Sequence, residues 1–173
     1  MSAETNVLII TPFFLPNIGG AETYVHELCE YLRQHGCFVN VLTYQPITTS
    51  GVRGKSLETR DNMVVRRYQW IGFNLFHRLE KHPVLNFLYL TPYLLLRSFL
   101  WMLFHHKDVD VIDAQGLNSA VVAAVLKRLF RKKAVVSVMS LYSFVPDSAV
   151  ARLFRPSLCR HFLTVAVPQR SPV

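Results

Sequence analysis

Residues 7–43 change their hydrophobic period twice, and this pattern constrains the fold more than any other feature of the chain. Val7–Thr11 is a short apolar run of strand-forming residues, typical of a buried parallel strand. From Ala21 onward apolar residues recur at helical spacing, and Gly36 fits the end of that helix. Phe38–Thr43 is a second apolar strand. A strand–loop–helix–strand unit of about 35 residues is what a crossover between parallel strands requires.

The rest of the chain continues this alternation. Asn118 is a candidate cap for a further helix, and residues 45–62 are polar and turn-rich, so we expect an exposed loop there. Alternating strands and helices predict an α/β fold, a Rossmann-like parallel sheet with helices on both faces. A length of 173 residues fits one domain over residues 1–173. The further strands are predicted at Met63–Trp70, Asp108–Ala114, Ala134–Ser140 and Phe162–Val167.

The segment Val84–Phe104 is the most apolar part of the chain, and its length is close to the ~20 apolar residues that a membrane-spanning helix needs. Three features argue against a span: Pro92 near the middle, Arg97 well inside, and flanking segments that belong to one sheet pattern. The alternatives that remain are a helix or helix pair packed on the domain and a helix lying in the membrane surface.

The second alternative is favoured by aromatic residues within the segment and by basic residues that flank it, Arg78, Lys81 and Lys107. On this alternative the domain contacts a membrane peripherally. The residues expected to face the membrane are Phe87, Tyr93, Arg97 and Trp101.

The chain is basic, with 19 Lys and Arg against 11 Asp and Glu, which gives a formal net charge of +8. Such a surface suits nucleic acid, anionic lipid or phosphorylated small molecules. The sequence contains no nucleic-acid-binding motif and no long run of Lys and Arg, so we expect no nucleic-acid partner.

Cysteine and histidine give no metal-binding pattern. Cys29, Cys37 and Cys159 have neither metal nor redox spacing, and the adjacent His105 and His106 cannot share one helix face. We therefore expect no bound metal. The N-terminus has no basic stretch and no cleavage site of a secretion signal, which favours a cytoplasmic location.

The Gly19–Gly20 pair lies between a predicted strand and a predicted helix. Glycine lets the backbone approach a ligand closely, and the amides at a helix start favour an anionic group such as a diphosphate. The spacing is neither that of a dinucleotide-binding loop nor that of a P-loop, so a simple flexible turn is the alternative.

Three segments in the same order resemble the N-terminal domain of the family 4 glycosyltransferases, which have the GT-B fold. The first contains a Pro-x-x-Gly-Gly-x-Glu loop and a strand preceded by His-Gly. Together the matches cover about residues 6–145. The segments are PFFLPNIGGAETYVHELCEYLRQHGCFVNVLT, DVDVIDAQGLNSAVVAAVLKRLF and AVVSVMSLYSF.

The resemblance implies a two-domain enzyme with its active site between the domains, of which this chain is the acceptor-side, N-terminal half. The family's Gly-Gly loop reaches toward the diphosphate of a nucleotide-sugar, and here that loop is Gly19, Gly20, Ala21 and Glu22. The nucleotide-sugar is a co-substrate, and no cofactor or metal is implied. The implied reaction is hexosyl transfer with retention of configuration.

Three positions depart from the family pattern. Family members often carry His where this chain has Asp113, Gln115 and Met139. Gln115 can form hydrogen bonds but cannot act as a base, whereas Asp113 is either a base or a structural carboxylate at a strand end. These two residues are the candidate catalytic pair. The third match places Tyr142 on the acceptor side.

The donor-binding Glu-x7-Glu motif of the family does not occur after Leu141. We therefore expect an incomplete enzyme, inactive without a C-terminal donor domain. It would take part in sugar transfer to a lipid-linked or polysaccharide acceptor of the cell envelope, at the inner face of the plasma membrane. The alternative is a non-catalytic subunit that binds an acceptor or membrane and pairs with a separate donor-domain protein.

Overall fold

A parallel sheet forms the centre of the structure, a computed structural model that describes residues 5–49, 51–70, 73–79, 81–137 and 164–166. Within these residues the sheet has seven strands in the order β3-β4-β2-β1-β5-β6-β7, and only β3 runs antiparallel to its neighbour. The strands are β1 Asn6–Ile10, β2 Phe38–Tyr44, β3 Leu57–Arg60, β4 Met63–Tyr68, β5 Val111–Gln115, β6 Lys133–Ser137 and β7 Thr164–Ala166.

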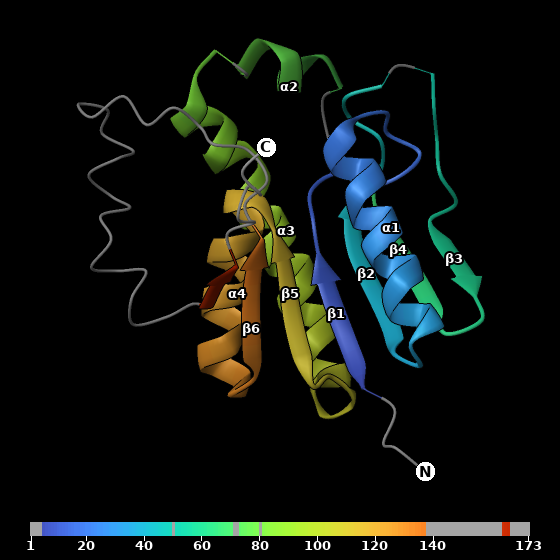
Figure 1. Ribbon diagram of the computed structural model, residues 1–173. Coiled ribbons are helices and arrows are strands. Elements are labelled where there is room, and N and C mark those ends of the chain that lie inside the picture. The colour runs from blue at the N-terminus through green and yellow to red at the C-terminus, as the bar shows by residue number, and fades with distance from the viewer. Residues whose placement is uncertain (1–4, 50, 71–72, 80, 138–163, 167–173) are drawn as a thin grey trace, which may run out of the picture.

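Helices cover both faces of this sheet, which confirms the predicted α/β architecture (Figure 1). One helix, α1, lies on one face, whereas α3 and α4 lie on the other. The helices are α1 Gly20–Gln34, α2 Phe73–Leu79, α3 Pro83–His105 and α4 Gly116–Phe130, with a short 3-10 turn, η1, at His106–Asp108.

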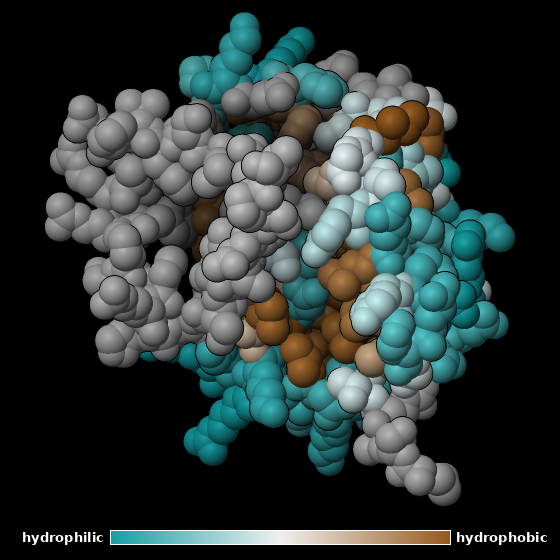
Figure 2. All heavy atoms as spheres, viewed as in Figure 1, coloured by the Kyte–Doolittle hydropathy of each residue, from teal (hydrophilic) through white to brown (hydrophobic). Residues whose placement is uncertain are grey.

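Strand residues alternate between two hydrophobic cores because successive side chains of a strand point to opposite faces. In β1, Val7 and Ile9 pack under α1, whereas Leu8 and Ile10 pack against α3 and α4. This double burial explains why the strands appear in the sequence as continuous apolar runs. Seen from the α1 side, hydrophobic residues gather at the centre of the face and hydrophilic residues cover the outside of α1 (Figure 2).

The predicted loop 45–62 contains one strand that sequence reasoning missed. β3 pairs antiparallel with β4 from Leu57 opposite Arg66 to Arg60 opposite Met63. The strand is short and mostly exposed at the edge of the sheet, so it lacks the apolar pattern by which the other strands were predicted.

The apolar segment Val84–Phe104 forms a single helix, α3, with Pro92 inside it. Among the described residues, Val84–Asp108 is the stretch long and apolar enough to cross a membrane by length and composition. However, α3 packs its inner face on the sheet and on α4, with Leu90, Leu94 and Met102 fully or almost fully buried. The helix is therefore part of the domain core along one side.

Three of the four residues expected to face a membrane contact the domain instead. Trp101 is 8% exposed, with its ring stacked on His105. Tyr93 stacks on Trp70 at 4.4 Å between ring centroids, and the Arg97 guanidinium lies 4.2 Å from the ring centroid of Tyr68. The contacts with Trp70 and Tyr68 thus hold Tyr93 and Arg97 against the domain, and the Arg66 guanidinium of β4 lies 5.5 Å from the ring centroid of Trp101.

The fourth of these residues, Phe87, is partly buried. The exposed face of α3 is formed by a different set of residues, and all of its large exposed side chains are apolar. They are Val84, Leu85, Leu88, Leu96, Leu100, Leu103 and Phe104.

Candidate active site

The strand order reverses between β1 and β5. These two strands pair in parallel, with Ile9 opposite Asp113 and Ile10 opposite Ala114. α1 leaves β1 over one face of the sheet, whereas α4 leaves β5 over the other. The two connections therefore diverge at the carboxyl ends of β1 and β5, the position at which open α/β sheets bind ligands in a crevice. We refer to it as the β1–β5 crevice.

The Gly19–Gly20 loop lies between β1 and α1, directly at the start of α1. Gly19 is extended, and a Cβ atom added to it would lie 2.3 Å from Oε2 of Glu22. A side chain at position 19 would therefore displace the Glu22 carboxylate, which packs directly against the Gly19 backbone. Gly20, by contrast, has nothing within 4 Å of such an atom, and both Gly20 and Ala21 are exposed. The backbone at the helix start is open to a ligand.

Glu22 lies in the first turn of α1 and is 8% exposed. A carboxylate in this position interacts favourably with the helix dipole. Thr23 reinforces the same turn, because both its backbone N–H and its Oγ1 donate to the carbonyl of Gly19, at 3.1 and 3.0 Å. The predicted loop residues thus form one local structure, with Glu22 stabilising it.

Asp113 and Gln115 border the crevice from β5. Their side chains point to the α1 face, since Ile112 and Ala114 point into the opposite core. Gln115 Nε2 donates to Asp113 Oδ1 at 2.9 Å. Burial raises the pKa of Asp113 from 3.8 to about 6, although the hydrogen bond from Gln115 lowers it. The carboxylate therefore changes charge just below neutral pH, as a general base requires.

Gln115 is almost fully buried, and its Oε1 has no hydrogen-bond partner among the described residues. The next residue, Gly116, has a φ of +82°, a left-handed conformation that favours glycine. The chain therefore turns sharply from β5 into α4 directly after the Gln115 side chain. This amide oxygen is an acceptor available to a ligand hydroxyl.

A hollow of about 630 Å³ lies at the carboxyl ends of β2 and β4. Its wall includes Gln45, Ile47 and Trp70, and the Trp70 Nε1 atom is buried without a hydrogen-bond partner within the described part of the chain. Trp70 in turn stacks on Tyr93 of α3. Sequence reasoning missed this hollow, because its wall comes from the turn-rich loop and from two strand ends.

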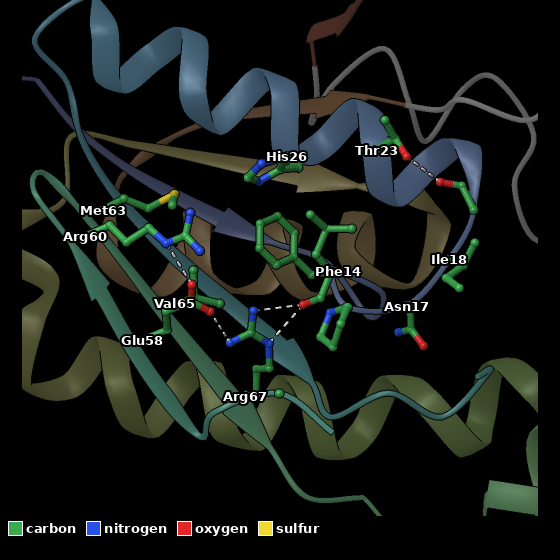
Figure 3. Close-up of a pocket in the computed structure, with 14 residues that line it drawn as sticks. Phe14, Asn17, Ile18, Thr23, His26, Glu58, Arg60, Met63, Val65 and Arg67 are labelled. Carbon is green, nitrogen blue, oxygen red and sulfur yellow. Dashed lines mark hydrogen bonds and ion pairs between the residues drawn. The ribbon is translucent and has the colours of Figure 1, made fainter. Parts of the chain in front are cut away.

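A second pocket, of about 460 Å³, lies between α1 and the β3–β4 hairpin (Figure 3). Arg67 closes its base, where Nε and one terminal nitrogen donate to the carbonyl of Leu15 at 3.0 and 2.8 Å. A third bond reaches the carbonyl of Lys55, and the Glu58 carboxylate lies 3.0 Å away. Arg67 was not a candidate from sequence, where it is one of many basic residues.

Two expected features lie partly or wholly outside what the structure describes. Tyr142 and Met139 fall in residues 138–163, outside the described ranges. Among the residues searched, which are those described, no three His, Cys, Asp or Glu side chains form a group able to hold a metal ion.

Solved structures with a similar fold are sugar-transferring enzymes. Sucrose-phosphate synthase from Thermosynechococcus elongatus matches 90% of this chain and 38% of its own, with a TM-score of 0.54 and 18% identity. The catalytic domain of starch synthase IV from Arabidopsis thaliana, bound to ADP and acarbose, matches 80% of this chain and 34% of its own, with a TM-score of 0.54 and 17% identity. This chain thus spans less than half the length of either protein.

At these identities the likeness shows the fold alone, the GT-B architecture of the two neighbours. No curated protein matches the sequence. The family model for Glycosyltransferase Family 4, however, matches residues 18–170, which is most of the chain and includes the Gly19–Gly20 loop and the Asp113–Gln115 pair. The chain therefore belongs to glycosyltransferase family 4.

Proposed function

We propose that this chain is the acceptor-side half of a glycosyltransferase that moves a sugar from a nucleotide-sugar to a lipid-linked or polysaccharide acceptor. The observation that carries the proposal is the parallel pairing of β1 with β5, which places the strand that leads to α1 beside the strand that ends in the Asp113–Gln115 pair. An open helix start on one side and a carboxylate with a raised pKa on the other are the two groups that such a transfer needs.

In this reaction the acceptor oxygen bonds to the anomeric carbon of the sugar, and the bond from that carbon to the diphosphate oxygen breaks. The backbone amides at Gly20 and the dipole of α1 would stabilise the negative charge that develops on the departing diphosphate. Asp113, when ionised, would take the proton of the acceptor hydroxyl, and Gln115 would orient that hydroxyl through Oε1. No cofactor or metal is needed for these roles.

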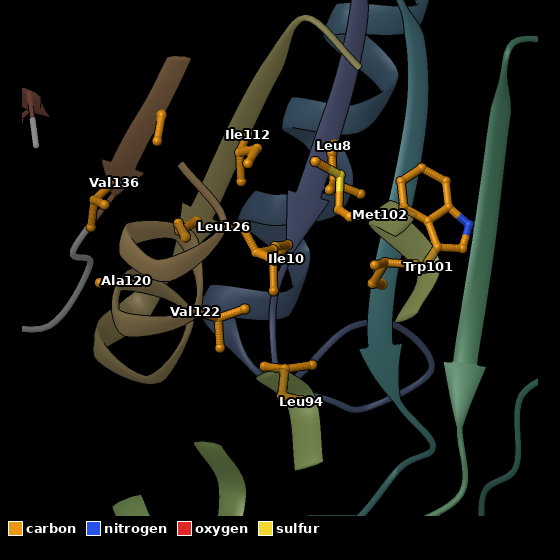
Figure 4. Close-up of a cluster of buried hydrophobic side chains, with 14 of the residues drawn as sticks. Leu8, Ile10, Leu94, Trp101, Met102, Ile112, Ala120, Val122, Leu126 and Val136 are labelled. Atoms are coloured by element: carbon orange, nitrogen blue, oxygen red, sulfur yellow. The ribbon is translucent and has the colours of Figure 1, made fainter. Parts of the chain in front are cut away.

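The acceptor side of the proposal rests on α3. Its inner face, with Leu94, Trp101 and Met102, lies among strand residues in the core (Figure 4). Its outer face exposes seven large apolar residues, with Leu88 at 58% and Phe104 at 82%. An apolar face of this extent on a basic protein suits the surface of an anionic membrane.

The hollow at the ends of β2 and β4 is joined to α3 through the stack of Trp70 on Tyr93. An acceptor with a polar head and a lipid tail fits this arrangement, with the head in the hollow and the tail beside the outer face of α3. The protein would then work on the cytoplasmic side, peripherally bound at the inner face of the plasma membrane.

The donor half of the active site belongs to the second domain of GT-B enzymes, so we propose that the chain alone does not transfer sugar. The test is transfer from radiolabelled UDP-, GDP- and ADP-hexoses to a total lipid extract. It is run with the chain alone and with the chain fused to the C-terminal domain of a family 4 enzyme. We expect transfer only by the fused protein. Transfer by the chain alone would contradict the need for a donor domain.

A non-catalytic subunit that binds an acceptor or a membrane and pairs with a separate donor-domain protein is the second candidate. It is favoured by the exposed apolar face of α3, because such a face can bind a membrane or a lipid without any catalytic activity. It predicts lipid binding without transfer in any combination of the same assay. Transfer by the fused protein would exclude it.

A further inference from the structure

The pocket between α1 and the β3–β4 hairpin exists because no described helix follows β2. In its place the chain forms β3 and β4, so α1 is the one helix in the described part of the chain that packs on this face of β4. The pocket has a floor of Phe14, Met63 and Val65, and its volume of about 460 Å³ is that of a small-molecule site. It lies on the β4 side of α1, and Gly19 of the loop that begins α1 is one of its lining residues.

Two polar atoms at this pocket are buried without a partner. Asn17 is fully buried; its Oδ1 accepts a hydrogen bond from Thr48 Oγ1 at 2.7 Å, whereas its Nδ2 has no partner among the described residues. Nδ1 of His26 is also buried without a hydrogen-bond partner among the described residues, and the His26 ring packs edge-on against Phe14. Both residues line the pocket. A buried donor without a partner is costly, and an oxygen atom of a ligand would satisfy the Asn17 amide.

The charge of the pocket wall is positive. The single carboxylate, Glu58, binds Arg60 through Oε1 at 2.9 Å and Arg67 through Oε2 at 3.0 Å. Two guanidinium groups against one carboxylate leave one formal positive charge on this wall. Arg67 is buried and bonded to backbone carbonyls, but the Arg60 side chain is 59% exposed and bonded through Nε alone in the recorded pairs. Arg60 is therefore the group that can reach an anion.

We propose that this pocket binds a small anionic molecule of sugar size that carries a phosphate group. Its anionic group would lie at Arg60 and an oxygen acceptor at the Asn17 amide, with its body over Phe14 and Val65. Because Asn17 precedes Gly19 by two residues, the occupant would also fix the loop that begins α1. The site thus goes beyond the proposed sugar transfer and is available to regulate it.

The test is a nuclear magnetic resonance titration of the ¹⁵N-labelled chain at low salt with ribose 5-phosphate, inorganic phosphate and ribose. We expect saturable shifts of the Asn17 side-chain amide and of the backbone amides of Ile18 to Gly20 with ribose 5-phosphate. Inorganic phosphate should give the same shifts more weakly, and ribose none. Absence of saturable shifts up to about 10 mM ribose 5-phosphate would overturn the proposal, as would equally strong binding of ribose.

Variants locate the binding. Asn17→Asp replaces the donor with a carboxylate, and Arg60→Gln removes the accessible cation from an exposed side chain that folding does not need. Each should weaken binding about tenfold or more. Lys133→Gln removes one charge from an exposed residue of β6 outside the pocket and should keep the affinity within about twofold. If Asn17→Asp does not fold, Arg60→Gln decides alone, and unchanged affinity in Arg60→Gln would overturn the site.

Discussion

Gln115 donates a hydrogen bond to Asp113, with Nε2 and Oδ1 2.9 Å apart, and so fixes a half-buried carboxylate at the carboxyl end of β5. The bond joins two residues on the same face of one strand. It leaves the other oxygen of Gln115 without a partner among the described residues. The two side chains thus fix each other. The Gln115 amide oxygen and the Asp113 carboxylate both point toward the α1 side of the sheet.

The raised pKa of Asp113 predicts how stability changes with pH. Because the folded state binds this proton more tightly than the unfolded state, the free energy of unfolding falls as pH rises from about 4 to about 6. Asp113→Asn removes this loss of stability, because Asn does not ionise, and its side-chain oxygen can still accept the hydrogen bond from Gln115. The variant should therefore be more stable than the wild type at neutral pH, by at most about 3 kcal/mol, with little difference near pH 4.

Urea unfolding across this pH range measures the effect. Asp108→Asn, at an exposed carboxylate of η1, is the matched control and should show little pH-dependent difference. A difference between Asp113→Asn and the wild type that does not vary with pH would contradict the raised pKa.

The packing of Glu22 against Gly19 predicts a coupling between these residues. Gly19→Ala places a methyl group where the carboxylate lies, so it should cost about 1–2 kcal/mol of stability. In a Glu22→Ala background the cost should fall to the difference between Gly and Ala at a helix N-cap, about 0.5–1 kcal/mol. Gly20→Ala, with open space around the added atom, should be neutral or stabilising. Equal costs of Gly19→Ala in both backgrounds would rule out the contact.

Arg67 and Arg60 bind the same carboxylate, but we expect their replacement to lower stability by very different amounts. Arg67→Met leaves the carbonyls of Leu15 and Lys55 without their donors and should cost about 3 kcal/mol. Arg60→Met removes an exposed pair to Glu58 and should cost less than about 1 kcal/mol. Thermal unfolding of both variants checks this ranking, and a reversed order would contradict the placement of Arg67 at the base of the pocket.

The parallel strands β1 and β2 could be predicted from sequence because both of their faces are buried, so each appears as an apolar run. The helix predicted from Ala21 is confirmed for the same kind of reason, its apolar residues being repeated at helical spacing. Gly36 adopts a φ of +77° just after that helix, as its predicted position at the helix end requires.

Other features depend on contacts between distant residues. Asn118 was predicted to cap α4, but the helix begins at Gly116 and the Asn118 side chain donates to Thr91 of α3. In α3 nearly every position is apolar, so hydrophobicity could not indicate which side faces the sheet. Arg97 and Trp101 turn inward, where Arg97 lies over the ring of Tyr68 and the Trp101 ring lies under the guanidinium of Arg66, two contacts between residues far apart in the sequence.

The outer face of α3 predicts binding to anionic membranes. Co-sedimentation with vesicles of phosphatidylglycerol and phosphatidylcholine should recover the wild-type chain, and added salt should weaken the binding. The double variant Leu96→Glu and Leu100→Glu places two charges on the exposed face and should bind at least about tenfold more weakly. Leu57→Glu is the matched control, since Leu57 is 56% exposed on β3, away from α3. Equal loss in both proteins would show that α3 is not the contact face.

The central claim is that sugar transfer takes place in the β1–β5 crevice. The rate of sugar transfer by the chain fused to a donor domain tests this claim most directly. The account predicts that Asp113→Asn lowers kcat by about 100-fold or more at neutral pH while the fused protein stays folded, because the base is lost. The control Leu57→Glu should keep the wild-type rate. A rate for Asp113→Asn within about twofold of the wild type would contradict the assignment of this crevice as the site of chemistry.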